Sequence, residues 1–86
     1  MQETDYLVAI LSPLVNRPEA LVVTRTQDER GVLLTIEADR FDYGKIIGKQ
    51  GETIKSVRTI INCFGMTINS KLSVKVAAPY KAKELV

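Results

Sequence analysis

The 86-residue sequence contains no histidine, no tryptophan and a single cysteine, Cys63. Without histidine the chain has no imidazole to bind zinc or to serve as a catalytic base, and one cysteine cannot form an internal disulfide. We therefore expect no metal centre, no cofactor and no enzymatic activity. We expect Cys63 to be a small buried apolar residue. A chain without disulfides suits a reducing compartment, so a cytoplasmic location is expected.

Long apolar runs and aromatic side chains are also scarce. The longest uninterrupted apolar run is Leu7 to Leu11, far short of the roughly 20 residues that a membrane-spanning helix needs. The acidic first residues, Met1 to Asp5, differ from the basic region that opens a secretory signal. The chain has only two Phe and three Tyr, so it has few aromatic side chains on which the bases of a nucleic acid could stack. We expect a soluble protein without membrane contact.

Length and composition indicate one small globular domain over residues 1–86. A hydrophobic content of 45% is ordinary for a compact chain, and we predict a core at about residues 5–77 with a frayed C-terminal tail at 78–86. Charge is divided unevenly, because residues 1–39 carry a net charge of −4 and residues 40–86 a net charge of +6. Such polarity is common in proteins that bind nucleic acid.

Hydrophobic periodicity predicts a helix and then a hairpin in the first half of the chain. The helix begins after Thr4 as its N-cap. Pro13 either bends it or separates its last turn, because a proline inside a helix loses a backbone hydrogen bond. Two segments rich in β-branched residues, 20–26 and 32–38, are joined by a polar turn, which is the pattern of an antiparallel hairpin. The apolar face of the helix is predicted to comprise Leu7, Ile10, Leu11, Leu14 and Val15.

The second half is predicted to contain two helices and a strand. A short helix at residues 41–47 ends at Gly48, and a longer helix runs from about Glu52 to Gly65 as its C-cap. A final strand alternates apolar and polar residues over 71–76. A three-stranded sheet with the helices packed on one face buries all these apolar stripes, giving an α+β fold of the order α-β-β-α-α-β. The apolar positions of this half are Ile54, Val57, Ile61, Phe64, Leu72, Val74 and Val76.

A G-x-x-G sequence lies between the two predicted helices, at Gly48 to Gly51. The two glycines permit a tight turn from helix to helix and leave no Cβ in the way of an approaching backbone. Lys49 and Gln50 stand at the tip, one cationic and the other able to donate and accept hydrogen bonds. This chemistry suits a sugar-phosphate backbone held beside a narrow groove.

With these flanks and this order of elements, the chain resembles a type II KH domain. It is most similar to the small bacterial single-KH RNA-binding proteins of the KhpA family. The resemblance covers about residues 5–77 and is most specific over residues 46–55, IIGKQGETIK. It implies binding of single-stranded RNA beside the G-x-x-G loop and a role as RNA chaperone or post-transcriptional regulator. It also implies a homodimer, or a heterodimer with a second KH-domain protein of the KhpB type.

The residues themselves also support a non-catalytic RNA-binding site around this loop. The start of the second helix adds backbone N–H groups and the positive end of the helix dipole. Ile47 and Ile54 supply an apolar floor, whereas the carboxylate of Glu52 repels a nearby phosphate. The predicted RNA-binding residues are Lys45, Ile47, Gly48, Lys49, Gln50, Gly51, Ile54, Lys55 and Arg58.

Other interpretations of the same residues stay open. The basic residues also fit a solvated helix surface, and the two isoleucines also fit the core. A phosphate-binding Walker A loop does not fit, because only three residues separate Gly44 from Gly48.

The main alternative function is a KH-like protein-interaction subunit that acts through homo- or heterodimerisation. Association with the ribosome is a third possible function. The alternative interface is predicted at Ile60, Ile61 and Phe64.

Overall fold

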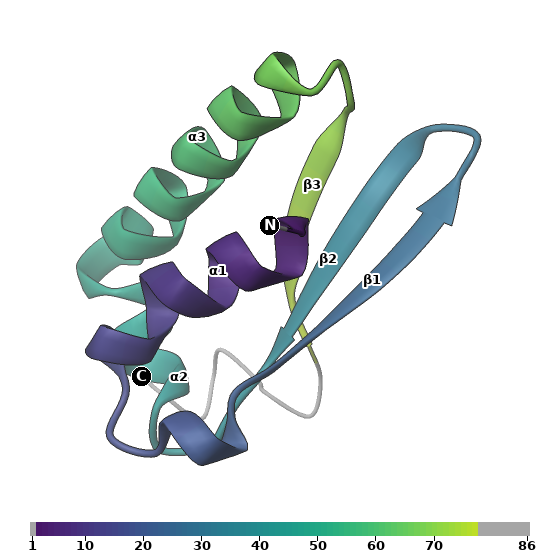
Figure 1. Cartoon of the computed structure of the whole chain (residues 1–86). Helices are drawn as coiled ribbons and strands as arrows, with labels where there is room; N and C mark the ends of the chain where they lie inside the picture. The colour runs from purple at the N-terminus through teal and green to yellow at the C-terminus, as the bar shows by residue number, and fades with distance from the viewer. Residues whose placement is uncertain (1, 78–86) are drawn as a thin grey trace.

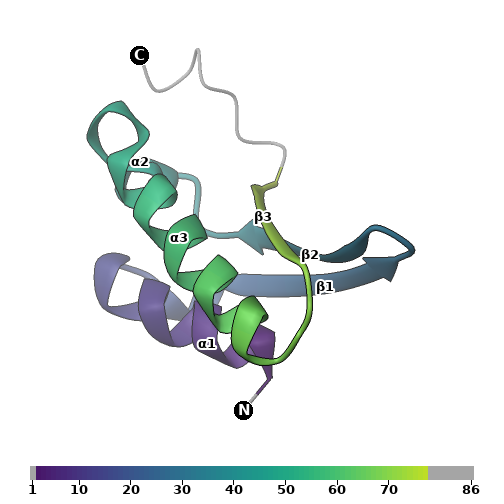
Figure 2. The ribbon, with the colours of Figure 1, turned by 90° about the horizontal axis from the view of Figure 1, so that it is seen from above.

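The structure is a computed structural model of the chain, and it describes residues 2–77; the expected tail at 78–86 lies outside the described residues. Helices cover one face of a three-stranded sheet, as Figures 1 and 2 show. The α+β fold and the predicted order of elements are therefore confirmed. In chain order the elements are α1 (Glu3–Leu11), β1 (Val22–Asp28), β2 (Gly31–Glu37), α2 (Tyr43–Ile47), α3 (Glu52–Thr67) and β3 (Leu72–Val76).

The sheet has β2 as its central strand. β1 pairs with it in antiparallel fashion through the hairpin, and β3 pairs with it in parallel fashion. Val32, Leu34 and Ile36 of β2 are buried beneath the helices and alternate with less buried residues, because successive side chains of a strand point to opposite faces. Because β2 is central, β1 and β3 each keep one edge that pairs with no strand within residues 2–77. The other core residues are Leu7, Leu11, Val15, Leu21, Ile46, Ile54, Val57, Ile61, Leu72 and Val74.

Pro13 separates the last turn of the first helix, which is one of the two expected outcomes. α1 ends at Leu11, and Ser12–Leu14 form a 3₁₀ turn that contains the proline. This tighter turn changes the direction of the side chains, so Leu14 is 40% exposed and its predicted place in the core is wrong. The N-cap is Gln2 rather than Thr4, and the Gln2 N–H donates to Asp5 Oδ2 at 3.1 Å. No helix among residues 2–77 is both long and apolar enough to cross a bilayer.

Two expectations for α3 are wrong. The helix continues past Gly65 to Thr67, so Gly65 is not its C-cap. A Cβ on Gly65 would lie 2.6 Å from the Ser70 carbonyl oxygen, so the glycine is needed where the chain returns closely along the helix. Cys63 is exposed rather than buried, because it lies two positions beyond the buried Ile61 and turns away from the sheet.

Asp42 ties the start of α2 to the connection between α1 and β1. Its side chain is 1% exposed, and its two carboxylate oxygens accept hydrogen bonds from the backbone N–H groups of Asn16 (3.1 Å) and Arg17 (3.0 Å). Burial opposes ionisation, but these two bonds and the nearby charges of Lys45 and Arg17 outweigh it, so the pKa of Asp42 is lowered. The carboxylate thereby fixes α2 against the rest of the domain.

We expect Asp42→Asn to lower the free energy of unfolding by about 2–3 kcal/mol at neutral pH, because the amide turns a donor toward a backbone N–H. A lowered pKa means that the carboxylate stabilises the fold above its ordinary value of 3.8 and loses this effect as the pH falls through the lower folded value. Urea denaturation at a series of pH values measures both effects. A variant whose stability falls as steeply as that of the wild type between about pH 5 and pH 2 would contradict this role.

Candidate nucleic-acid interface

The turn between α2 and α3 takes four residues. α2 ends at Ile47 with Gly48 as its C-cap, Lys49–Gly51 form one 3₁₀ turn, and α3 begins at Glu52. The φ angle is positive at Gly48 (78°), Gln50 (57°) and Gly51 (76°), so the backbone adopts left-handed conformations at three positions of the turn. Gln50 carries a side chain in this region, which costs about 1–2 kcal/mol. These conformations reverse the chain within one turn, and Lys49 and Gln50 are exposed at its tip.

The two glycines of the turn are needed for different reasons. A Cβ on Gly48 would lie 2.6 Å from the Cβ of Thr53 and 2.8 Å from its backbone nitrogen, so a side chain there would collide with the first turn of α3. No atom lies within 4 Å of the Cβ position of Gly51. Gly48 is therefore needed for space and for its backbone angle, and Gly51 for its backbone angle alone.

Positive charge collects at the loop. Lys49 and Lys55 are exposed, and neither makes an ion pair within residues 2–77. Lys45 is partly neutralised, because its Nζ lies 3.8 Å from Asp42 Oδ1. α3 begins at Glu52, and its N-cap Gly51 supplies no side-chain hydrogen bond, so the positive end of the helix dipole is at the loop. The exposed Glu52 carboxylate in the first turn works against an approaching phosphate.

The two isoleucines predicted as an apolar floor have different positions. Ile54 is 6% exposed and belongs to the core, so it supports the loop from below and offers little surface. Ile47 is half-buried and packs against the same core. Ile47 is therefore the one of the two that presents apolar surface beside the loop.

Arg58 links α3 to the unpaired edge of β3. Its Nε donates to the carbonyl oxygen of Val74 at 3.2 Å. Val32 N–H bonds to the carbonyl of Lys71, and Ala77 N–H to the carbonyl of Ile36. Alternate residues of this segment, from Lys71 to Ala77, therefore bond to β2. The residues between them, including Val74, have backbone groups that point away from β2. The guanidinium thus spans the space between helix and strand, a position that the sequence did not reveal.

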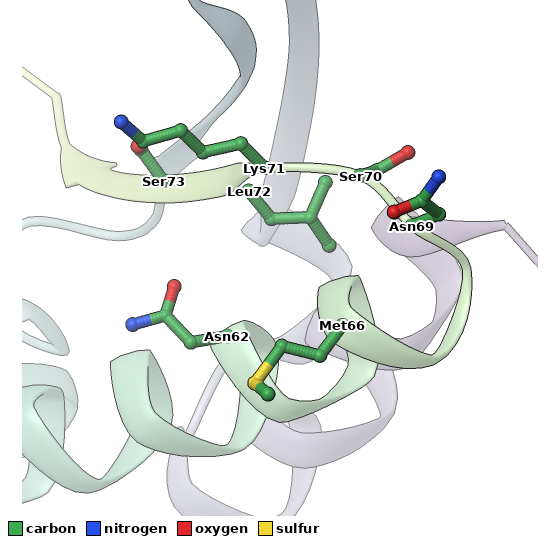
Figure 3. A pocket seen from close by; sticks show the side chains of 7 residues that line it. All are labelled: Asn62, Met66, Asn69, Ser70, Lys71, Leu72 and Ser73. Carbon is green, nitrogen blue, oxygen red and sulfur yellow. The ribbon is translucent and has the colours of Figure 1, made fainter.

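Beyond Arg58, a hollow opens between the C-terminal half of α3 and the beginning of β3 (Figure 3). Asn62 and Met66 follow Arg58 by four and eight positions, so the three side chains lie along one side of the helix. Figure 3 shows Asn62 pointing from α3 toward the strand. The lining offers amide, hydroxyl and ammonium groups beside the apolar side chains of Met66 and Leu72, which suits a ligand with both hydrogen-bonding and apolar parts. The residues that line the hollow are Asn62, Met66, Asn69, Ser70, Lys71, Leu72 and Ser73.

The sequence analysis missed the residues of this hollow. The spacing from Arg58 could have found Asn62 and Met66 on the helix. The loop residues could not be found, because their place depends on how β3 returns along α3.

Comparison with known proteins decides the family. The KH domain of the family described as KhpA/KhpB matches residues 4–76. The chain belongs to this family. An RNA-binding protein KhpA from Bacillus subtilis is 33% identical over 72 residues, which cover 84% of this chain and 89% of that protein. One from Chlamydia caviae is 35% identical over 72 residues, covering 84% and 92% respectively. The predicted family is confirmed, and it is a family of non-catalytic proteins.

A solved structure with a similar fold is the crystal structure of a single-residue variant of Era from Aquifex aeolicus, bound to GDP and tetrafluoroaluminate. The TM-score is 0.60 at 17% identity, over 90% of this chain and 31% of the Era chain. At this identity the likeness concerns the fold alone, and it agrees with the type II KH arrangement.

Three Gly→Ala substitutions should separate the requirements of the turn. Gly48→Ala should lower the free energy of unfolding by more than about 2 kcal/mol, because the new Cβ collides with Thr53 and the backbone is strained. Gly51→Ala should cost about 1–2 kcal/mol through strain alone. Gly44→Ala is the control, since no atom lies within 4 Å of its Cβ position, and it should stabilise α2 by about 0.5–1 kcal/mol. Urea denaturation gives all three values, and equal effects at Gly48 and Gly51 would refute the assignment.

Proposed function

We propose that the chain binds single-stranded RNA along the groove between α3 and β3, anchored at the G-x-x-G loop. We further propose that it acts in the cytoplasm as an RNA chaperone or post-transcriptional regulator. The observation that carries the proposal is the loop itself, where two exposed polar side chains and the positive end of α3 meet a backbone without Cβ atoms at Gly48 and Gly51. The family relatives named as RNA-binding proteins support the same conclusion.

The RNA backbone is held at the loop. A phosphate there meets the ammonium of Lys49, the amide of Gln50 and the N-terminal end of α3, all of which favour an anion. Lys55 lies one turn further along the helix and contacts the next phosphate. Asp42 partly neutralises the charge of Lys45, and the carboxylate of Glu52 repels the phosphate. We therefore expect a modest affinity for RNA that falls as salt is added.

The bases lie in the groove beyond the loop. The chain has few aromatic residues, so bases are held edge-on by hydrogen bonds and apolar contact rather than between rings. Ile47 supplies apolar contact, and Arg58 and Asn62 supply donors along one side of α3. A KH loop clamps about four nucleotides in this manner, which requires a single strand whose base edges are unpaired.

Replacing Lys49 and Gln50 together by Asp should abolish RNA binding and leave the fold intact. Two carboxylates would then face the phosphate, and aspartate tolerates the left-handed backbone at position 50 better than most residues. Fluorescence anisotropy with a short labelled RNA measures the binding, and circular dichroism with urea denaturation checks the fold.

The control is Ala9→Asp, which adds a carboxylate on the exposed side of α1, away from the loop. This variant should bind RNA with nearly the affinity of the wild type. A folded Lys49→Asp/Gln50→Asp protein that binds RNA as well as the wild type would refute the proposal.

A second role, pairing with another copy or with a second KH-domain protein of the KhpB type, is favoured by an apolar surface on α1 and α3. The rings of Tyr6 and Phe64 are in contact, with centroids 4.2 Å apart. Tyr6 on α1 is 38% exposed, Ile60 on α3 is 51% exposed, and Leu14 in the 3₁₀ turn after α1 is 40% exposed. By helical spacing, Ile60 and Phe64 lie on the other side of α3 from Arg58, Asn62 and Met66, so one protein can pair there and still bind RNA.

Ile60→Asp should convert a dimer into a monomer, because it places a charge in the apolar surface. Size-exclusion chromatography with light scattering measures the mass at matched concentration. Met66→Asp is the matched control, since Met66 is 80% exposed on the same helix but faces the groove. This control should keep the dimer and weaken RNA binding. A wild-type chain that stays monomeric would refute self-association.

A further inference from the structure

A second hollow lies at the same end of the molecule as the hollow of Figure 3. Figure 1 shows the turn of the β1–β2 hairpin and the loop before β3 at this end of the sheet. Lys71 and Ser73 line both hollows, so the second hollow adjoins the first at the beginning of β3. The residues that line the second hollow are Asp28, Arg30, Gly31, Val32, Leu33, Lys71 and Ser73.

The backbone contact between Gly31 and Lys71 brings the two hollows together. The carbonyl oxygen of Lys71 accepts a hydrogen bond from the Val32 N–H at 2.9 Å. A Cβ on Gly31 would lie 2.5 Å from the same oxygen, so only a glycine lets the hairpin approach β3 this closely. In Figure 3 the side chains of Lys71 and Ser73 stand on the other side of β3 from Leu72. Lys71 and Ser73 are therefore placed to contact a ligand that passes from the groove to the face of β3 opposite to Leu72.

The second hollow combines cationic and apolar groups. Arg30 is 87% exposed and is held by Asp28, whose Oδ2 lies 3.2 Å from its Nη2. Lys71 is exposed and makes no ion pair with any residue in the range 2–77. Half-buried Leu33 belongs to the sheet face that the helices leave uncovered (Figure 2). Two cations against one carboxylate leave a net positive charge beside an apolar surface, which matches a nucleotide strand.

We propose that this second hollow binds the same single-stranded RNA, beyond the nucleotides clamped at the G-x-x-G loop. The RNA strand leaves the groove over Ser73. Its phosphates contact Lys71 and Arg30, and one of its bases lies on Leu33. Asp28 holds the guanidinium of Arg30 in place. This inference rests on the proposed function, and it predicts that the chain binds more nucleotides than the loop alone accounts for.

The test is the dependence of binding on RNA length. Labelled random-sequence RNAs of about four nucleotides fill the groove at the loop, whereas RNAs of about twelve nucleotides also reach the second hollow. Arg30→Gln, which changes a residue that lines only the second hollow, should weaken binding of the longer RNA about three- to fivefold and change that of the shorter RNA less than about twofold. For the longer RNA, the slope of log K against log salt should fall by about 0.7 for each lost phosphate contact.

Arg17→Gln is the matched control for Arg30→Gln. Arg17 is also exposed, at 63%, and is also paired with a carboxylate two residues away, at 3.2 Å from Glu19. It lies before β1, at the opposite end of that strand from the hairpin turn. The Arg17→Gln variant removes the same charge and should bind both RNAs as the wild type does.

The outcomes distinguish this inference from the proposed function. If Arg30→Gln binds both lengths as the wild type does, or loses affinity equally for both, the second contact surface is refuted. The proposed function then still stands, provided that Lys49→Asp/Gln50→Asp abolishes binding. A wild-type chain that binds neither RNA refutes both.

Discussion

The close approach of α3 to Gly48 is the constraint on which the rest of the site depends. The first turn of α3 lies so near that a Cβ on Gly48 would be 2.8 Å from the backbone nitrogen of Thr53. This contact lets two helices meet through a turn of four residues, and it therefore decides that Lys49 and Gln50 project from the tip. It also places the start of α3 where a bound anion would lie. Lys49, Gln50 and the dipole of α3 act at one point because Gly48 carries no side chain.

The other wall of the groove depends on the return of β3 along α3. Gly65 lies close to the backbone of Ser70, and Gly31 lies close to the backbone of Lys71. In both places a Cβ on the glycine would collide with a carbonyl oxygen. These contacts fix β3 between α3 and β2, and β3 keeps an unpaired edge. In most sheets such an edge is a liability for aggregation. Here Arg58 reaches that edge from the helix, and the groove that we propose for RNA runs beside it.

Carboxylates and cations have different tasks in this fold. Asp42 accepts two backbone hydrogen bonds, and the buried Glu3 accepts one from Arg25 of β1. Backbone hydrogen bonding chiefly, with Arg25 adding to it, lowers the pKa of Glu3. Both carboxylates thus hold elements together, whereas Lys49, Lys55 and Lys71 are exposed and take part in no ion pair among the described residues. The charge asymmetry of the sequence therefore becomes an exposed cationic surface along α3 and the start of β3.

The sequence by itself determined the order of elements, the alternation of Val32, Leu34 and Ile36, and the G-x-x-G turn with its flanks. Each of these depends on neighbours within a few positions, and local periodicity records such neighbours. The resemblance to the family followed from the same local pattern. Only the tertiary structure decided that Arg58 meets Val74, 16 positions away, and that Asp42 meets Asn16, 26 positions away. It also decided that Gly65 admits a returning strand, because a contact between distant segments exists only when packing brings them together.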